Sequence, residues 1–458
     1  MSTSTREASA VDAPLTLAEP PPRTLGLTDS LGLWGNLGIS LLLPVAATFV
    51  VLPGRPLAVT ILAIVVGAVI GSVLLGLGAA AGAREGVPAM VLLRGLFGRR
   101  ISYLPTVLNV LQCVGWATFE IVIIAEAASR AAHAPRWPFV LGAGVLATLM
   151  ALRPLGAVRV LARYAVWVAL AAVLYLFLRV LSHPLPPIAG DGAISFWTAV
   201  DIVVALPVSW FPLAADYTRH VRGGRPAFVG TAVGYGAATV AFFTLGVLAL
   251  AAYAAAGLDV IEALLAVPLG ALAVVVLVVV EIDEAFANIY STAVSTQNLS
   301  GRLDRRVLVL AVGVTATVLA FTFDITAYEP FLFLIGAVFV PLVGVFAVAY
   351  LCQLASRTTQ RRRGLASGGW DTSETAPARP LLLIGWVAGF VAYQLTLPTY
   401  FDGVGRGWTA WWTARQLDLG INPSNGWSAS LVSLAVAAAL TALVSVAAAL
   451  RRRPAVAP

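Results

Sequence analysis

The chain has 458 residues, of which 59% are hydrophobic and 11% are charged, and its formal net charge is +7. Soluble proteins carry roughly 25% charged residues, so this composition excludes an ordinary soluble domain. A basic chain can indicate a nucleic-acid partner, but here the arginines are spread over short loops between apolar runs. We therefore expect a polytopic, all-α membrane protein that has no nucleic-acid partner and lies in the lipid bilayer.

Twelve apolar runs are candidates for membrane spans, because a helix needs roughly 20 mostly apolar residues to cross the hydrocarbon core. They begin at Leu31, Leu57, Tyr103, Pro138, Val158, Ala193, Phe228, Val260, Val307, Pro330, Pro380 and Ser428. The run at Pro138 is short, whereas the run at Val260 is long enough for a tilted helix with an extension.

Arginine residues concentrate on alternate loops between these spans. One set of loops carries Arg84, Arg94, Arg99, Arg100, Arg153, Arg159, Arg163, Arg219, Arg222, Arg225, Arg302, Arg305, Arg306, Arg357 and Arg361 to Arg363, and the C-terminal tail adds Arg451 to Arg453. The opposite loops hold only Arg55, Arg130, Arg136, Arg179, Arg406 and Arg415. The positive-inside rule then predicts a multi-pass protein of the cell membrane with both termini in the cytoplasm.

Composition along the chain predicts its organisation. Residues 1–28 are polar and proline-rich, which is typical of a disordered cytoplasmic tail and not of a signal peptide. Residues 29–355 hold ten spans, 356–379 resemble a cytoplasmic linker, 380–451 hold the last two spans, and 452–458 form a second cytoplasmic tail. Ten spans followed by two suggest a core of two inverted five-helix repeats, as in many secondary transporters.

Helix-breaking residues occur at matching positions of the two predicted repeats. The first span reads GNLGIS at residues 35–40 and continues to Pro44, and the sixth reads PVSWFP at residues 207–212. Glycine weakens a helix by about 0.8–1 kcal/mol and proline by about 3 kcal/mol. Both spans should therefore be interrupted, with freed backbone groups available to a ligand or an ion.

Acidic residues fall inside three predicted spans: Glu120 and Glu126 in the third, Asp201 in the sixth, and Glu281, Asp283 and Glu284 in the eighth. A charged carboxylate at the bilayer centre costs at least about 2.5–3.5 kcal/mol, so these groups should face a cavity, a partner, an ion or a proton. Trp116 and Glu120 are four residues apart and lie on one helix face. They would offer a flat apolar surface beside a hydrogen-bonding carboxyl group.

Other classes of protein fit the sequence less well. Cys113 and Cys352 form no disulfide or metal-ligand pattern, and no nucleophile–base constellation predicts a membrane-embedded enzyme. An ion channel usually has a repeated pore loop, which is lacking here. Because the chain has no lysine, it has no ATP-binding loop of the usual type, so transport should be secondary and should need no organic cofactor.

Several motifs together resemble the nucleobase:cation symporter-1 family, closest to its hydroxymethylpyrimidine and cytosine permease branch. Residues 209–219 read SWFPLAADYTR, which is similar to a signature of that branch. Further similar stretches are GVPAM at 86–90 with Arg94, FGRR at 97–100, VGW at 114–116, and YSTAVS at 290–295 with Asn298. The resemblance covers residues 31–363 and implies a LeuT-type fold of about twelve helices that works by alternating access.

The resemblance also implies a substrate site. Trp116 matches the stacking tryptophan of the family, and Glu120 takes the place of a glutamine. On span six, the position of the family's second aromatic residue falls on Pro207, so Trp210 or Phe211, with Ser209 beside them, should serve instead. Asn288 lies within one residue of a substrate-binding asparagine.

The coupling-cation site departs from the family pattern. Sodium-coupled relatives use backbone carbonyls of span one and hydroxyl groups of span eight. Alignment on Tyr290 places Gly38 and Leu41 at the carbonyl positions and Asp283 and Glu284 at the hydroxyl positions. These four residues could bind Na⁺, or the two acids could carry H⁺. A shift of one helical turn would instead place Ser291 or Thr292 at the hydroxyl positions.

The sequence thus predicts a monomeric, cation-coupled importer of a flat nucleobase-like heterocycle. A protonated Glu120 would complement a 4-aminopyrimidine, which presents an acceptor ring nitrogen beside an amino donor. Burial favours such a neutral carboxyl group. This chemistry favours cytosine or hydroxymethylpyrimidine over uracil, and an allantoin, hydantoin or purine permease of the same family is the alternative.

Overall fold

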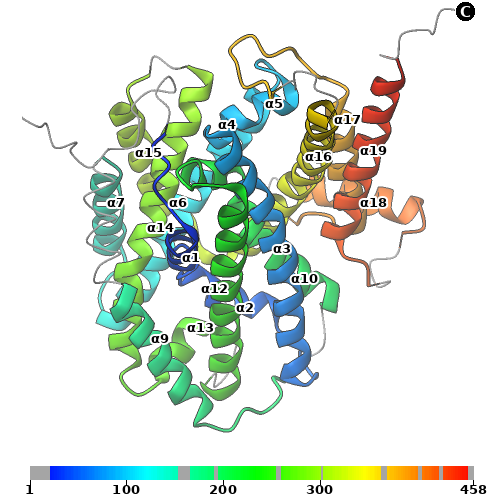
Figure 1. Cartoon of the computed structure of the whole chain (residues 1–458). Coiled ribbons are helices and arrows are strands. Elements are labelled where there is room, and N and C mark those ends of the chain that lie inside the picture. Colours follow the sequence, from blue (N-terminus) through cyan, green and yellow to red (C-terminus); the bar gives the residue numbers. More distant parts are fainter. Residues whose placement is uncertain are drawn as a thin grey trace, which may run out of the picture.

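The computed structural model describes residues 21–152, 166–189, 194–253, 259–300, 303–362, 369–400, 405–421 and 426–451. In these ranges the regular elements are helices (Figure 1). The predicted loop arginines 153, 159, 163, 302, 363, 452 and 453 and most of the predicted N-terminal tail lie outside the described residues.

Each predicted span corresponds to a helix or to a pair of helices. The first five are α1 (Leu27–Asn36) with α2 (Leu42–Val50), α3 (Leu57–Glu85), α6 (Tyr103–Ala132), α7 (Trp137–Leu152) and α9 (Val166–Leu181). The next five are α10 (Phe196–Ser209) with α11 (Phe211–Thr218), α12 (Gly224–Tyr253), α14 (Gly270–Leu299) preceded by α13 (Val260–Ala266), α15 (Arg305–Ala320) and α16 (Tyr328–Arg362). The last two are α17 (Leu382–Thr396) and α19 (Ala429–Arg451).

The short elements α4 (Ala89–Leu92), α5 (Arg94–Phe97), η2 (Ile325–Ala327) and α18 (Arg406–Asp418) lie in the connections. Among the described residues, six helices are long and apolar enough to cross a membrane by length and composition. The other six spans are shorter, as in α7, or are interrupted or carry buried acids. The chain is therefore a multi-pass, all-α protein.

Helix contacts place eight of the first ten spans in two groups, and α9 and α16 belong to neither. The helices α1, α2, α3, α10, α11 and α12 pack together, and α6, α7, α14 and α15 form the second group. Each group takes the same spans from both halves of the core, as two related repeats require. Helices α17, α18 and α19 lie together at one side of the bundle, far from α7 and α15 (Figure 1).

Glycine residues on α3 allow α10 and α11 to approach it closely. A Cβ atom at Gly67 would lie 2.8 Å from the carbonyl oxygen of Val200, and one at Gly82 would lie 2.6 Å from the Cα of Ala215. Because backbone atoms cannot move away as a flexible side chain can, a larger residue here would push span six outward. The first group is consequently held together by tight backbone contact.

Both predicted interruptions are present, but they differ in extent. In span one, residues 37–41 separate α1 from α2. In span six, only Trp210 separates α10 from α11, and its N–H still donates to the carbonyl of Pro207 at 3.2 Å. Span six is thus bent at one residue, whereas span one opens over five.

Parts of the predicted disordered tail and of the predicted linker have regular backbone partners. The backbone N–H of Leu25, within the predicted tail, donates to the carbonyl of His220 at 3.1 Å. Helix α16 continues to Arg362, beyond the predicted start of the linker at residue 356. Polar composition predicted disorder for the tail, but the backbone of Leu25 pairs with that of His220, and the predicted linker begins as the end of α16.

The described end of the linker also binds the loop between spans two and three. Trp370 Nε1 donates to the carbonyl of Leu92 at 2.7 Å, and Arg94 forms a 2.8 Å ion pair with Glu374. The same arginine donates from Nε to Asn298 Oδ1 at 2.7 Å, at the end of α14. This buried guanidinium therefore joins the loop, the linker and span eight.

Asp201 has a structural role at the junction of spans six and twelve. Its side chain is buried and accepts hydrogen bonds from the backbone N–H groups of Ala429 at 2.7 Å and Ser430 at 3.0 Å and from the hydroxyl of Ser428. The first N–H groups of a helix lack partners within that helix, so a carboxylate stabilises them. Asp201 anchors the beginning of α19 to α10.

We expect Asp201→Asn to lower the temperature of thermal unfolding by several degrees. Asparagine has one acceptor oxygen, so at least one donor at the start of α19 would stay buried without a partner. Tryptophan-fluorescence melting of the purified protein measures this change. Asp418→Asn, at an exposed pair with Arg415, is the matched control and should melt as the wild type does. Equal melting of both variants would contradict the anchor.

Candidate substrate site

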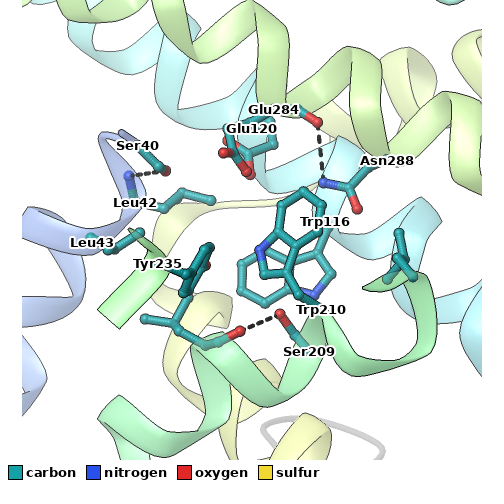
Figure 2. A pocket seen from close by; sticks show the side chains of 12 residues that line it. Ser40, Leu42, Leu43, Trp116, Glu120, Ser209, Trp210, Tyr235, Glu284 and Asn288 are labelled. Atoms are coloured by element: carbon teal, nitrogen blue, oxygen red, sulfur yellow. Dashed lines mark hydrogen bonds between the residues drawn. The ribbon is translucent and has the colours of Figure 1, made fainter. Parts of the chain in front are cut away.

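A closed, narrow pocket lies where the two interrupted spans meet (Figure 2). Its walls come from the span-one break, α6, the break in span six, α12 and α14. The lining residues are Ser40, Leu42, Leu43, Trp116, Glu120, Leu206, Ser209, Trp210, Leu213, Tyr235, Glu284 and Asn288. Both helix groups thus contribute to one central pocket.

Most of the predicted substrate residues come together in this pocket. The lining includes Trp116 and Glu120 of α6, Ser209 and Trp210 of span six, and Asn288 of α14. Trp116 and Glu120 share one helix face, as their spacing requires. On α14, residues 281, 284 and 288 also share a face, since helical neighbours are three or four residues apart.

Phe211 does not reach the pocket, so its predicted role is corrected. Its ring packs against Phe346 at a centroid distance of 5.3 Å, and it lies against Gly78 of α3. Because α11 begins at this residue, one step along the helix turns the side chain by about 100° away from Trp210. Of the two predicted aromatic residues of span six, Trp210 lines the pocket.

Aromatic side chains form the apolar walls. The Trp210 ring lies 6.2 Å from the ring of Tyr235 and 6.0 Å from that of Trp34, and the Trp34 contact is edge to face. Trp116 is held edge to face by Phe331 at 5.1 Å and by Tyr328 at 5.9 Å. These contacts fix two indole rings at the wall of the pocket.

Three polar atoms of the lining are buried without a protein partner: Trp116 Nε1, Glu120 Oε2 and Glu284 Oε1. Buried polar groups are normally hydrogen-bonded, and leaving one unpaired costs about 1–3 kcal/mol. Glu120 and Glu284 are only 2% and 4% exposed, so bulk water does not satisfy them. These three atoms are therefore available to a polar ligand.

Other polar groups at the pocket form hydrogen bonds with backbone carbonyl groups of the protein. The hydroxyl of Ser209 donates to the carbonyl of Leu206 at 2.6 Å, and Asn288 Nδ2 donates to the carbonyl of Glu284 at 3.2 Å (Figure 2). Gln112 Nε2 donates to the carbonyl of Ser209 at 2.9 Å. This bond satisfies the carbonyl of Ser209, whose regular helical donor, the N–H of Leu213, donates instead to the carbonyl of Trp210 at 3.0 Å at the bend.

Glu281, and not Asp283, contacts the break in span one. It is fully buried and accepts from the backbone N–H of Leu41 and from the hydroxyl of Ser40 at 2.8 Å. It also lies within hydrogen-bonding reach of Glu120. The N–H groups at the start of α2 favour an anion, so the carboxylate occupies the positive end of this helix.

The four predicted cation ligands have different contacts, and their binding of one ion stays a prediction. The carbonyl of Leu41 accepts from Val45 within α2 at 3.3 Å, and Asp283 accepts from Asn36 Nδ2 at 2.8 Å. Gly38 lies against α12, where a Cβ would be 2.5 Å from that of Ala238. Glu284 alone of the four lines the pocket. Asp283 and Glu284 have different surroundings because neighbouring residues of a helix point in different directions.

Glu126 also differs from its prediction as a buried intramembrane acid. It lies near the end of α6 and pairs with Arg130 at 2.6 Å, and Arg130 in turn pairs with Asp259 at 2.6 Å.

Sequence reasoning missed Tyr235 and Ser40 as lining residues. Ser40 was inside the predicted break, but Tyr235 lies in a span with no break or acid to single it out.

Comparisons with known proteins agree with this architecture. The sequence model of the family described as permease for cytosine/purines, uracil, thiamine and allantoin matches residues 23–360. A search of curated protein sequences finds no match. The chain therefore belongs, by its family match over most of its length, to these membrane permeases, also known as the nucleobase:cation symporter-1 family.

Solved structures share the fold at low sequence identity. Mhp1, a nucleobase-cation-symport-1 family transporter, in a closed conformation with bromovinylhydantoin bound, has a TM-score of 0.68 and 18% identity, covering 94% of this chain and 99% of that chain. Its inward-facing conformation gives 0.69 and 17%, covering 97% and 96%. A Na⁺-coupled sialic acid symporter gives 0.60 and 9%, covering 93% and 90%.

Proposed function

We propose that this permease imports a flat, aminated heterocycle, with cytosine and hydroxymethylpyrimidine as the best candidates. The observation that carries the proposal is the closed pocket at the two helix breaks, where indole rings lie beside unpartnered carboxyl oxygens. The rings would stack on the ligand, and the carboxyl group of Glu120 would bind its polar edge.

Alternating access follows from the division into two helix groups. Substrate would bind while the pocket is open on one side and would leave after the groups rock against each other. The two groups meet at the pocket, which receives Trp210 and Tyr235 from one and Trp116 and Glu284 from the other. A ligand that bridges the groups would stabilise the closed state. This geometry supports a carrier over a channel.

The first test is a panel of ligands on the purified protein. Cytosine and hydroxymethylpyrimidine should raise the thermal unfolding temperature, because a ligand that binds only the folded state stabilises it. Uracil presents an N–H where cytosine has a ring acceptor and should raise it less. A response to hydantoins or allantoin alone would favour the second candidate, which the hydantoin bound to the related Mhp1 fold also suggests.

We further propose that import is coupled to a cation, Na⁺ or H⁺, through the acids near the span-one break. We place both termini in the cytoplasm because of the arginine-rich loops, and we propose that the protein works as a monomer in the cell membrane. Glu281 and Asp283 contact Ser40 and Asn36 of span one, and Glu284 faces the pocket. A cation bound at this position would join span one to α14.

Transport in vesicles distinguishes the two cations. With H⁺ coupling, a protonophore should abolish uptake and omission of Na⁺ should not. With Na⁺ coupling, Na⁺ should increase substrate affinity, and substrate should increase Na⁺ affinity by the same factor. Uptake that responds to neither gradient would contradict cation coupling.

In either case, Asp283→Asn combined with Glu284→Gln should allow exchange at saturating substrate and prevent accumulation against a gradient, because the neutral side chains no longer respond to the cation. Glu126→Gln, at the ion pairs near the end of α6, is the control and should accumulate substrate normally. Full accumulation by the double variant would exclude these two acids and leave Glu281 as the coupling residue.

A further inference from the structure

The pocket has more free hydrogen-bond acceptors than free donors. Among the described residues that line it, Glu120 and Glu284 each have one unpartnered carboxyl oxygen, and Trp116 Nε1 is an unpartnered donor. The hydroxyl groups of Ser40 and Ser209 already donate within the protein. A ligand with N–H donors would therefore pair with these carboxyl oxygens.

No basic side chain balances these acids. The pocket lining contains no arginine or histidine in the described part of the chain, and the chain has no lysine. Glu281 and Asp283 have partners of their own, which are Ser40 with Leu41 and Asn36. Glu120 lies within hydrogen-bonding reach of Glu281, and a proton shared by these two leaves one negative charge between them. For Glu284, the described residues that line the pocket include no basic group. Because a buried, uncompensated carboxylate costs several kcal/mol, positive charge must arrive with the ligand or as a proton.

The aromatic walls are also compatible with positive charge. Trp116, Trp210 and Tyr235 line the same pocket as the two acids (Figure 2). Indole and phenol rings attract a cation placed over their faces, and the attraction increases when water is excluded. A flat cation can therefore gain from the rings and from the acids at the same time.

We propose that the pocket selects a flat organic cation with an amidinium-type edge, in which two neighbouring N–H donors point the same way, and that Glu120 and Glu284 receive it. The inference rests on the proposed function, whose substrate it refines. A 4-aminopyrimidine has this edge when its ring nitrogen beside the amino group is protonated. Carboxylates bind such paired donors through two parallel, charge-assisted hydrogen bonds.

A matched pair of ligands tests the charge preference directly. Benzamidine is a flat cation at neutral pH, and benzamide has almost the same shape but is neutral and replaces one donor by an acceptor. We expect isothermal titration of the purified wild-type protein to give at least about tenfold tighter binding of benzamidine, equivalent to one charge-assisted hydrogen bond. Equal or tighter binding of benzamide would overturn the proposal.

Variants then test the two receiving residues. Glu120→Gln and Glu284→Gln should each reduce the preference for benzamidine, and the double variant should bring the two affinities to within about twofold, since neither site would retain a charge. Glu126→Gln lies on the same helix as Glu120 but outside the pocket, and it should keep the wild-type ratio. An unchanged ratio in the double variant would overturn the assignment to these residues.

Titration of cytosine in the same samples separates this inference from the proposed function. Binding of cytosine without a preference for benzamidine would leave the function standing and refute the cation selectivity. A benzamidine preference without binding of any aminopyrimidine would refute the function and leave the cation selectivity standing. The wild-type ligand pair provides a result even if a variant fails to fold.

Discussion

Trp116→Ala is expected to weaken substrate binding by roughly 5- to 150-fold, because stacking of a base on an aromatic ring contributes about 1–3 kcal/mol where it has been measured. The indole lines the pocket and is held in place by Phe331 and Tyr328, so its loss removes a prepared surface. Titration of the purified variant with cytosine or hydroxymethylpyrimidine measures the effect.

Trp408→Ala provides the control for loss of a tryptophan. Trp408 lies on α18, packs against Trp412 at 5.7 Å and is not among the residues that line the pocket. This variant should bind substrate as the wild type does. Wild-type affinity in Trp116→Ala would remove this residue from the substrate site.

Glu120→Ala is expected to cost about 1–3 kcal/mol of binding free energy, because the polar edge of the bound heterocycle would stay unpaired. Glu120→Gln keeps the shape and offers a donor and an acceptor, so it should retain part of the affinity for neutral aminopyrimidines. The order wild type, glutamine, alanine in titration experiments is therefore the expected result. If both variants bind like the wild type, Glu120 serves only to contact Glu281.

The membrane fold could be predicted from the sequence because lipid imposes simple rules. The starts predicted at Leu57 and Tyr103 coincide with those of α3 and α6. Gly and Pro residues located both interruptions, since few other residues break a helix in a membrane. Helix α18 was not predicted, because its sequence at residues 406–418 is too polar and too short for a span.

The residues that line the pocket could be predicted better than the contacts of the acids around it. Trp116 and Glu120 needed only the spacing of one helix, whereas Glu281 and Asp283 needed the rotation of α14 relative to span one. Hydropathy does not fix that rotation when acids stand at residues 281, 283 and 284. The role of Asp201 needed knowledge of which span packs beside it, and that contact joins residues 227 positions apart.

The anchor at Asp201 gives the two halves of span six unequal freedom. A large tilt of α10 relative to α19 would break the hydrogen bonds that Asp201 receives from the backbone N–H groups of Ala429 and Ser430. Beyond Trp210, α11 has no such attachment to the last two spans, and its Asp216 instead accepts from the backbone N–H of Ala89 at 2.9 Å. In span six, α10 is therefore attached to the last two spans and α11 is attached elsewhere. The residue between them, Trp210, lines the pocket, so a change of angle between α10 and α11 would act directly on the pocket.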